Sequence, residues 1–298
     1  MPEDTPPIID YEGSDYQSTF WDQSNRQYED SAEMTALKRL LPPGGDLLLE
    51  LGAGAGRNTP RYAGYKRVVL LDYSLTQLIQ AQERLGKKER YIYVAGDVYH
   101  LPFKPGIYDG ATMIRVLHHL VSPPRALTEI RRVMKGGSTF ILEYANKQNL
   151  KAVLRYWLRK QEWDPFSTPP VEFVDLNFNF HPRYIRAELQ EAQFQLERQL
   201  TVSHFRINFL KKIVPTPLLV TLDSLAQLTG NLWQLSPSVF TRSRAVGTSP
   251  QPENPGDIFQ CPRCGSYPLD REEEQLVCSS CGQIYPLQDG IYDFRKFS

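Results

Sequence analysis

A short run of glycines is the part of this sequence whose spacing points most directly to chemistry. Gly52, Gly54 and Gly56 occupy alternate positions after an apolar stretch, residues 46–49, and Glu50 precedes them. Glycines placed in this way let the backbone turn sharply from a buried strand into a helix. Their missing side chains leave room for a small cofactor to lie against the main chain. The segment therefore predicts a cofactor site where a strand meets a helix.

An acid further along the chain narrows the choice of cofactor. A second apolar stretch, residues 67–71, ends in Asp72, where nucleoside-binding α/β domains place the acid that binds the ribose hydroxyls. Dinucleotide loops read G-x-G-x-x-G and hold a pyrophosphate, whereas this loop reads G-x-G-x-G. Glu50 in front of the loop would repel a pyrophosphate but suits the ammonium group of a methionine moiety. The pattern favours S-adenosylmethionine (SAM) over a dinucleotide.

Further segments match the same interpretation in chain order. They are Gly96-Asp97-Val98 after an expected strand at residues 91–95, a strand-like segment at 108–115, and a helix with a glycine turn at 124–137. With the glycine loop, these segments resemble the class I SAM-dependent methyltransferases of the broad type 11 subgroup. The resemblance extends well over residues 15–145 and loosely over 180–248. It implies a Rossmann-like, seven-stranded sheet and SAM contacts from Glu50, Gly52, Gly54, Gly56, Asp72, Tyr73, Asp97, Val98 and Arg115.

The four cysteines form a second chemical pattern near the C-terminal end of the sequence. Cys261 and Cys264 form one Cys-x-x-Cys pair, Cys278 and Cys281 form another, and a glycine follows each pair. Each glycine lets backbone N–H groups turn toward sulfur, which stabilises thiolates around a tetrahedral zinc ion. Two disulfides are the alternative. A zinc ion with four cysteine ligands has no open position for catalysis, so the predicted role is structural.

The segment that contains these cysteines is similar to a known small protein. Residues 284–294, after the second pair, resemble the zinc-ribbon activator subunit of several tRNA, rRNA and release-factor methyltransferases. The resemblance implies an activator fused to its enzyme, so that no separate activator subunit is expected. Seven acids against four bases in residues 257–298 suit phosphate binding poorly. The ribbon is therefore expected to support the enzyme domain rather than to bind RNA alone.

The remaining sequence supplies the elements that must position these residues. Five β-branched or aliphatic stretches alternate with helical ones between residues 46 and 144, which predicts an α/β fold with a doubly wound, mostly parallel sheet. Ser74 and Gln77 form a capping box for one helix. Ser122 is expected to cap another, which residues 136–137 would end.

The expected topology brings the candidate cofactor residues together. In such a sheet the ligand lies at the carboxyl ends of the strands. Four of the candidate residues fall at such ends: Glu50, Asp72, Asp97 and Arg115.

Composition shifts divide the chain into parts. We expect an N-terminal extension at 1–35, a methyltransferase domain at 36–246, a linker at 247–256 and a zinc ribbon at 257–298. The aromatic residues between 16 and 28 could form a lid over cofactor or substrate, or could simply pack on the domain. Substrate-binding insertions are expected at about 147–181 and 207–237, where the related enzymes vary.

The charge balance and the cysteine pattern indicate which partners and which cellular compartment to expect for this protein. Lysine and arginine number 34 and so do aspartate and glutamate, so no net field draws the protein toward nucleic acid or anionic lipid. No apolar run reaches the length of a membrane span, and the first residues lack the pattern of a signal peptide. Paired cysteines of this kind favour a reducing cytoplasm. We therefore expect a cytoplasmic protein without a membrane partner.

Candidate catalytic residues follow the fourth expected strand. With every cysteine assigned to metal, a cysteine nucleophile is excluded, and Arg115 and the residues after it lack the Asn-Pro-Pro-Tyr pattern that methylates exocyclic amines and glutamine amides. His118, His119 and Glu143 remain as candidate bases, since histidine titrates near neutral pH. The alternative is that the histidines pack in a surface loop and that Glu143 anchors its neighbours.

Three functions fit these patterns. The first is a SAM-dependent methyltransferase that acts on an O, N or activated C nucleophile of a small molecule. The second is an RNA methyltransferase, chiefly of tRNA, which the activator-like ribbon and a modest excess of bases in residues 150–212 support. The third is a SAM-binding scaffold without turnover.

Overall fold

The computed structural model describes residues 6–8, 12–13, 26–248 and 257–296. Most of the predicted lid, residues 16–25, and most of the predicted linker, residues 249–256, lie outside the described residues. The last part of the predicted lid belongs to helix α1, Gln27–Leu40, in which Tyr28 is buried.

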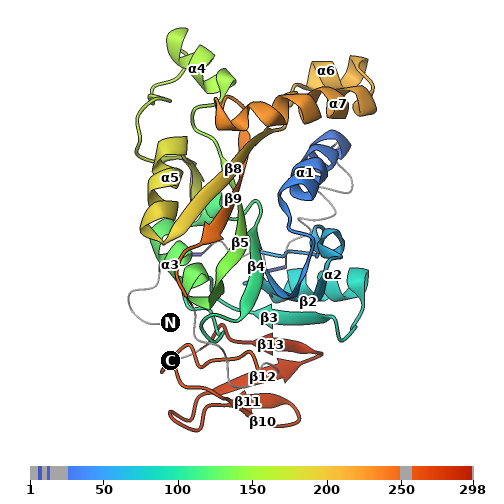
Figure 1. The fold of residues 1–298 in the computed structure, drawn as a ribbon, viewed down its shortest axis with the longest axis vertical. Helices are drawn as coiled ribbons and strands as arrows, with labels where there is room; N and C mark the ends of the chain where they lie inside the picture. The colour runs from blue at the N-terminus through green and yellow to red at the C-terminus, as the bar shows by residue number, and fades with distance from the viewer. Residues whose placement is uncertain (1–5, 9–11, 14–25, 249–256, 297–298) are drawn as a thin grey trace.

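A single large sheet organises the molecule (Figure 1). Its eleven strands lie in the order β10-β11-β12-β13-β3-β2-β1-β4-β5-β9-β8. Strands β1 to β5 pair parallel to one another, and β9 runs antiparallel between β5 and β8. The strands of the first seven-stranded part are β1 Gly45–Leu51, β2 Tyr65–Asp72, β3 Tyr91–Ala95, β4 Tyr108–Met113, β5 Met134–Ala145, β8 Phe194–Val202 and β9 Ser238–Ala245. The doubly wound, mostly parallel seven-stranded sheet is confirmed.

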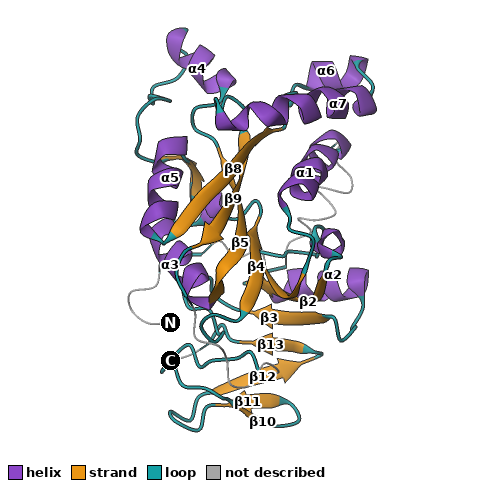
Figure 2. Cartoon of the chain, viewed as in Figure 1, coloured by secondary structure: helices purple, strands orange, loops and turns teal. Residues whose placement is uncertain are grey.

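Helices cover both faces of this sheet, as Figure 2 shows. Helices α3, Pro123–Val133, and α5, Pro182–Glu191, lie on one side, and α1 and α2, Leu75–Leu85, lie on the other. Two short 3-10 helices, η2 at Thr59–Tyr62 and η3 at Leu117–His119, follow β1 and β4. Strands buried between two helical layers need apolar residues on both faces, which explains the continuous apolar stretches of β1 and β2.

The helix caps match the sequence in part. Ser74 caps α2, because its side chain accepts a hydrogen bond from the backbone N–H of Gln77. Ser122 occupies the N-cap position of α3 and prolines follow in the first turn, as expected, but its side chain makes no capping hydrogen bond. Residues 136–137 do not end α3: the helix ends at Val133 and the two glycines belong to β5. The strand begins directly after the helix, which leaves no separate glycine turn.

The cysteine-containing segment extends the same sheet. Its strands are β10 Asp270–Arg271, β11 Gln275–Val277, β12 Ile284–Gln288 and β13 Ile291–Asp293. Strand β13 pairs parallel to β3, with Tyr292 opposite Val94, and the backbone N–H of Phe294 donates to the carbonyl of Ala95 at 2.7 Å. The C-terminal segment is thus joined to the larger sheet by main-chain hydrogen bonds.

Side chains join the two parts as well. Phe259, Tyr285 and Phe294 belong to the same apolar cluster as Val94 and Phe103 of the larger domain. The backbone N–H of Lys104 donates to the Ile258 carbonyl at 3.0 Å. The core is therefore shared, and the predicted boundaries between the parts stay a prediction.

Two insertions lie at the opposite end of the molecule from the C-terminal strands (Figure 1). The first contains α4, Leu150–Trp157, and the hairpin β6 Val171–Val174 with β7 Asn177–Asn179. The second contains α6 Asn208–Ile213, α7 Thr216–Ala226 and the 3-10 helix η4 Gln227–Asn231. Among the described residues, no helix has the length and apolar character needed to cross a membrane.

Candidate functional site

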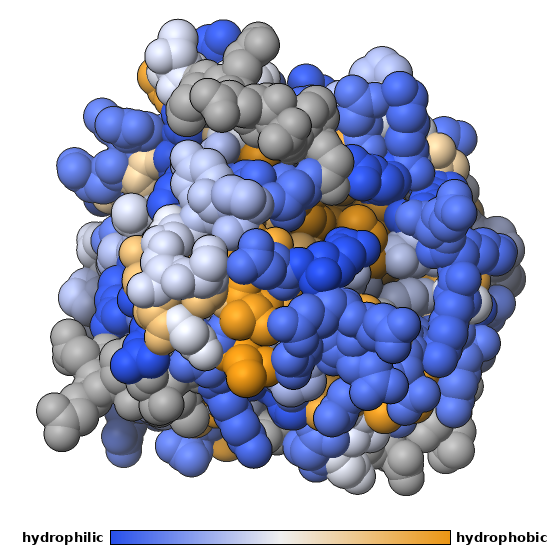
Figure 3. Space-filling view, turned by 90° about the horizontal axis from the view of Figure 1, so that it is seen from below, coloured by the Kyte–Doolittle hydropathy of each residue, from blue (hydrophilic) through white to orange (hydrophobic). Residues whose placement is uncertain are grey.

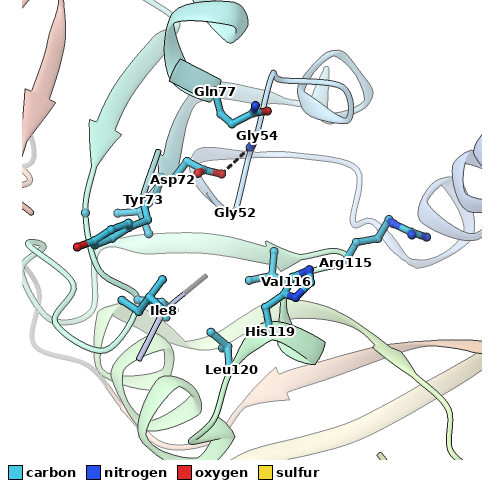
Figure 4. A pocket seen from close by; sticks show the side chains of 13 residues that line it. Ile8, Gly52, Gly54, Asp72, Tyr73, Gln77, Arg115, Val116, His119 and Leu120 are labelled. Carbon is cyan, nitrogen blue, oxygen red and sulfur yellow. Dashed lines mark hydrogen bonds between the residues drawn. The ribbon is translucent and has the colours of Figure 1, made fainter. Parts of the chain in front are cut away.

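A cavity opens where the parallel strands β1, β2, β3 and β4 end (Figure 4). It encloses about 780 Å³ of empty space, part of which is open to solvent. Its lining residues are Ile8, Gly52, Gly54, Leu71, Asp72, Tyr73, Gln77, Gly96, Val98, Arg115, Val116, His119 and Leu120. Six of the residues predicted to contact the cofactor are therefore brought together: Gly52, Gly54, Asp72, Tyr73, Val98 and Arg115.

The glycines of the loop are required for different structural reasons. All three have positive φ, at 64° for Gly52, 53° for Gly54 and 70° for Gly56. A Cβ on Gly52 would lie 2.1 Å from Cγ2 of Val116, so packing as well as backbone conformation requires glycine there. Gly56 does not line the cavity. Its missing Cβ makes room for the side chain of Leu85 in α2, so it allows the loop to approach that helix closely.

Asp72 presents a carboxylate to the cavity from the end of β2. Its Oδ2 accepts a hydrogen bond from the backbone N–H of Gly54 at 2.7 Å (Figure 4), and its Oδ1 accepts one from Ser74 at 3.0 Å. These backbone donors fix the orientation of the group. Because a carboxylate accepts about four hydrogen bonds, capacity remains for hydroxyl groups of a ligand.

Glu50 lies beneath the glycine loop and does not line the cavity. It is buried, and its Oε2 accepts a hydrogen bond from Oγ1 of Thr59 at 2.6 Å. Burial raises the pKa of Glu50 to about 7, although Thr59 and nearby arginines oppose this shift. The predicted contact between Glu50 and the cofactor stays a prediction.

Arg115 and Glu143 act as a structural pair at the end of β4. Arg115 has a φ of 62°, and its backbone N–H donates to Oε2 of Glu143 at 2.9 Å. The Arg115 side chain extends away from the cavity toward α1 (Figure 4), where Nη1 lies 3.3 Å from Oε1 of Glu33. Glu143 is buried, and burial raises its pKa. Its geometry is that of an anchor for Arg115, and its proposed role as a base stays a prediction.

The two candidate histidines lie together in η3, but only one faces the cavity. Their ring centroids are 3.9 Å apart, and His119 lines the cavity whereas His118 does not. Burial, with some contribution from Arg115, lowers the pKa of His119 to about 4, and burial holds that of His118 well below its ordinary value. Both rings are therefore neutral at pH 7 and are weak bases.

Asp97 is directed away from the cavity, although its neighbours Gly96 and Val98 line it. Its carboxylate accepts a hydrogen bond from the backbone N–H of Tyr99 at 2.8 Å and lies 2.7 Å from Nδ1 of His100. The predicted contact of Asp97 with an adenine stays a prediction. The pairing with His100 was not predicted, because residues three apart in a turn meet only once the turn is formed.

Several residues that line the cavity were not predicted to do so from the sequence. Ile8, Val116 and Leu120 have no motif of their own, Gln77 was predicted only as part of a capping box, and Ile8 belongs to the N-terminal extension. Glu12 places that extension, because its carboxylate accepts hydrogen bonds from the backbone N–H groups of residues 75 and 76 at the start of α2. An acid in this position is favoured by the helix dipole.

The C-terminal segment reaches the same wall of the cavity. Nη1 of Arg295 lies 3.5 Å from Oε2 of Glu12 and donates to the carbonyl of Tyr73 at 3.4 Å. Asp293 of β13 orients the guanidinium through a second ion pair at 2.9 Å. Arg295 therefore connects the N-terminal extension, the cavity wall and β13, which is the last strand in chain order.

Comparison with known families agrees with this geometry. Residues 49–142 match the methyltransferase domain family, and residues 257–290 match the family of Trm112p-like proteins. The chain carries a type 11 methyltransferase domain and a Trm112p-like domain. The methyltransferase match extends from the glycine loop to β5 and includes most of the cavity lining.

Curated relatives of the methyltransferase domain include several methyltransferases. A demethylmenaquinone methyltransferase of Clavibacter sepedonicus is 28% identical over 154 residues, which are 51% of this chain and 54% of that protein. A 2-phytyl-1,4-naphtoquinone methyltransferase of Nostoc punctiforme is 30% identical over 165 residues, 52% of this chain and 66% of that protein. The chain spans about half the length of the first of these relatives.

Solved structures share the fold at low sequence identity. A complex between the Haloferax volcanii Trm112 methyltransferase activator and a candidate methyltransferase matches with a TM-score of 0.56 and 16% identity, over 78% of this chain and 96% of that one. A candidate SAM-dependent methyltransferase of Listeria monocytogenes matches with a TM-score of 0.52 and 15% identity, over 74% and 99% of the two chains.

The four cysteines of the Trm112p-like domain form one cluster. Their Sγ atoms all lie within 4.8 Å of one another, with 3.7 Å between Cys261 and Cys281 and 3.5 Å between Cys264 and Cys278. A tetrahedral zinc ion with Zn–S bonds of about 2.3 Å separates its sulfur ligands by about 3.8 Å, so the cluster fits this metal. The hydroxyl of Tyr285 lies 3.0 Å from Sγ of Cys261 and would support a thiolate there.

Proposed function

We propose that this chain is a SAM-dependent methyltransferase that transfers a methyl group to an O, N or activated C nucleophile of a small molecule. The observation that carries the proposal is the Asp72 carboxylate, held by the Gly54 N–H at 2.7 Å at the edge of the cavity. An oriented acid beside a glycine loop suits a ribose with free hydroxyl groups.

The lining of the cavity fits the rest of the cofactor. Tyr73 and Val98 supply apolar area on either side of Asp72, where an adenine ring would lie, and Gly52 and Gly54 let a chain of atoms pass close to the backbone. SAM, when bound, supplies an electrophilic methyl group on a sulfonium. The protein's part is to hold acceptor and methyl group in line and to exclude water, and effective molarities of about 10⁵–10⁸ M are available from such positioning.

The acceptor end of the cavity is mainly apolar. Ile8, Val116 and Leu120 line it together with the neutral ring of His119. With a pKa of about 4, His119 suits hydrogen bonding to an acceptor better than removal of its proton at pH 7. Relatives named for demethylmenaquinone and 2-phytyl-1,4-naphtoquinone support an aromatic, quinone-type acceptor, whose nucleophilic form needs only a weak base.

An RNA acceptor is the second candidate. The Trm112p-like match supports it, as do four exposed bases on and after α4: Lys151, Arg155, Arg159 and Lys160. A SAM-binding scaffold without turnover is the third candidate, which the weak basicity of His118 and His119 supports.

We further propose a structural zinc ion on Cys261, Cys264, Cys278 and Cys281, and no separate activator subunit. The pairing of β13 with β3 supports the second point, because a fused domain already covers that edge of the sheet. We also propose a cytoplasmic location, in which the four thiols stay reduced.

Fractionation of labelled products tests the acceptor class. Purified protein is incubated with radiolabelled SAM and a cell extract, which is then separated into RNA, protein and metabolite fractions. We expect label in the metabolite fraction, and label in tRNA would favour the second candidate. SAM binding by calorimetry without label in any fraction would favour the scaffold, and tight binding of NAD instead of SAM would overturn the class.

A further inference from the structure

The end of the molecule formed by the two insertions exposes an unusual number of large apolar side chains. Leu232 is 79% exposed, Phe209 68% and Trp157 67%. We call this set the apolar end. It consists of Leu150, Leu154, Trp157, Leu158, Ile207, Phe209, Ile213, Leu218, Leu222, Leu225, Leu228, Leu232, Trp233 and Leu235. Single exposed apolar residues are normal, but a gathering of this size marks a surface that binds something.

The two insertions present these side chains at one end of the molecule. The backbone N–H of Leu150, at the start of α4, donates to the carbonyl of Leu235 at 2.8 Å. The side chain of Asn146 donates to the carbonyls of residues 234 and 236 at 2.8 Å each. Helices α4, α6 and α7 all lie at the end opposite the Trm112p-like domain, with α4 on one side and α6 and α7 on the other (Figure 1). The face at the end of the Trm112p-like domain is mostly hydrophilic (Figure 3).

The inner side of the apolar end is firmly packed, so its outer side is not simply a loose core. Asp223 of α7 is buried, accepts a hydrogen bond from the Tyr28 hydroxyl at 2.9 Å and lies 2.7 Å from Nδ1 of His204. Gln227 donates to the Ala32 carbonyl of α1 at 3.0 Å. Helix α7 is thus held to α1 by polar contacts on one face while it exposes leucines on the other.

Exposed bases outnumber exposed acids on the two insertions. The bases are Lys151, Arg155, Arg159, Lys160 and Lys212. The exposed acids are Glu162, which follows α4, and Glu172 and Asp175 of the β6–β7 hairpin. Between residues 207 and 235, all of which the structure describes, the one acid is Asp223, which is buried. A surface of leucine and tryptophan with lysine and arginine around it complements an apolar layer with a negatively charged border.

We propose that the apolar end binds the surface of an anionic lipid bilayer. Interfacial helices combine an apolar face rich in Trp, Phe and Leu with basic residues, and they lie in the headgroup region without crossing the bilayer. The sequence predicted no membrane partner for two reasons: no apolar run is long enough to span a bilayer, and lysine and arginine balance aspartate and glutamate over the whole chain. The first reason excludes only a spanning helix. The second concerns the net charge of the whole chain and not the local excess of bases at the apolar end. The inference concerns binding alone and is independent of the methyl-transfer activity.

Binding to vesicles tests the proposal. Full-length protein is mixed with vesicles of phosphatidylcholine alone or with added phosphatidylglycerol, and bound protein is measured by sedimentation. Trp157 and Trp233 are two of the four tryptophans, so a blue shift of tryptophan emission should accompany binding. We expect binding to the anionic vesicles, which weakens as salt is raised because the bases contribute electrostatically.

Two variants and a control separate the apolar from the electrostatic contribution to vesicle binding. The Phe209→Ser/Leu232→Ser variant should lose roughly a hundredfold in affinity, because two apolar side chains no longer enter the bilayer. The Arg155→Gln/Arg159→Gln variant should lose about tenfold or more, and only with anionic lipid. The control Tyr267→Ser/Ile284→Ser removes side chains that are 51% and 46% exposed in the Trm112p-like domain, and it should bind as the wild type does.

Each other outcome contradicts the proposal in a recognisable way. No sedimentation with anionic vesicles would overturn it directly. A dimer in analytical ultracentrifugation that Phe209→Ser/Leu232→Ser converts to a monomer, without vesicle binding, would assign the apolar end to a second copy of this chain. Binding of tRNA that depends on Arg155 and Arg159 but not on Phe209 and Leu232 would assign the bases to RNA.

Discussion

The two edges of the central sheet end in different ways. At the β3 edge, β13 continues the sheet by main-chain pairing, and Phe259, Tyr285 and Phe294 join the core of the larger domain. Beyond the β8 edge, the inserted helices pack on α1 with one face and expose leucines with the other. Among the described residues, the chain itself covers the first edge, whereas the helices beyond the second edge leave apolar side chains exposed.

The part of the molecule near the β3 edge, the closed half, and the part near the β8 edge, the open half, therefore have distinct tasks. The closed half holds the strand ends from which Asp72 and Gly54 reach the cavity, and Arg295 connects it to the Trm112p-like domain. The open half carries the two insertions that the sequence predicts to bind substrate. A rigid cofactor site beside an open partner surface is the arrangement expected if the fold is kept and the acceptor changes.

Removal of the metal should have the largest effect on the closed half. Structural zinc contributes about 10–16 kcal/mol in isolated zinc fingers, so chelation or Cys261→Ser should unfold the Trm112p-like domain and expose the β3 edge. Limited proteolysis and metal analysis, with one zinc expected per chain, check this. Ser279→Ala, in an exposed residue beside the cluster, is the control. Absence of zinc in unoxidised protein, or a C-terminal segment that stays protease-resistant after chelation, would contradict the metal assignment.

A methyl group added at Gly52 should disrupt the cavity wall. At a φ of 64° and with Val116 at 2.1 Å from the new Cβ, Gly52→Ala should cost about 2–5 kcal/mol of unfolding free energy. Gly137→Ala is the matched control, since its φ is 83° but nothing lies within 4 Å of its Cβ, and it should cost only about 1–2 kcal/mol. Equal losses in denaturant titrations would show that the contact with Val116 is unimportant.

Loss of the Asp72 carboxylate should weaken SAM without comparable damage to the fold. A hydrogen bond to a charged group contributes about 1.5–3 kcal/mol, so Asp72→Ala should reduce SAM affinity about ten- to a hundredfold in calorimetry. Asp46→Ala, an exposed acid in β1 that pairs with Lys66 at 2.7 Å, should bind SAM as the wild type does. Unchanged affinity of the Asp72 variant would refute its role.

Glu50 should make the stability of the closed half depend on pH. Its pKa in the folded protein, about 7, exceeds its ordinary value of 4.5, so the folded state holds more protons between these values and this residue's contribution to stability falls as pH rises through them. Glu50→Gln should therefore stabilise the protein by about 1–3 kcal/mol more at pH 8 than at pH 4. Thermal unfolding at both pH values, with the exposed Glu273→Gln as control, measures the difference. A pH-independent effect would mean that Glu50 has the same pKa in the folded and unfolded states.

The smallest effect is expected at the open end. Leu232 is 79% exposed, so Leu232→Ala should change the unfolding free energy by no more than about 0.5 kcal/mol. Leu276→Ala, in a residue that is 3% exposed in the Trm112p-like domain, should cost about 2–5 kcal/mol. A large loss in the Leu232 variant would mean that the apolar end is part of the folded core and would weaken the contrast between the two edges.

Local patterns in the sequence were sufficient for much of the fold and site. The glycine loop, Asp72 and the apolar stretches predicted a parallel sheet with a cavity at its carboxyl ends, because strand burial and glycine conformation are local properties. The two Cys-x-x-Cys pairs predicted the four-sulfur cluster for the same reason. The role of residues 136–137 was predicted wrongly because α3 passes directly into β5 and the usual turn is absent.

Long-range packing decided what local patterns left open. Ile8 and Arg295 reach the cavity from the two ends of the chain, and Glu50, Asp97 and Glu143 turn to partners outside its lining, at Thr59, His100 and Arg115. The sequence by itself determined the elements, the glycine loop and the metal ligands, since each depends on residues close together in the chain. Only the tertiary structure decided that the Trm112p-like domain continues the sheet and that the inserted helices expose their leucines, because edge pairing and surface exposure depend on which distant segments meet.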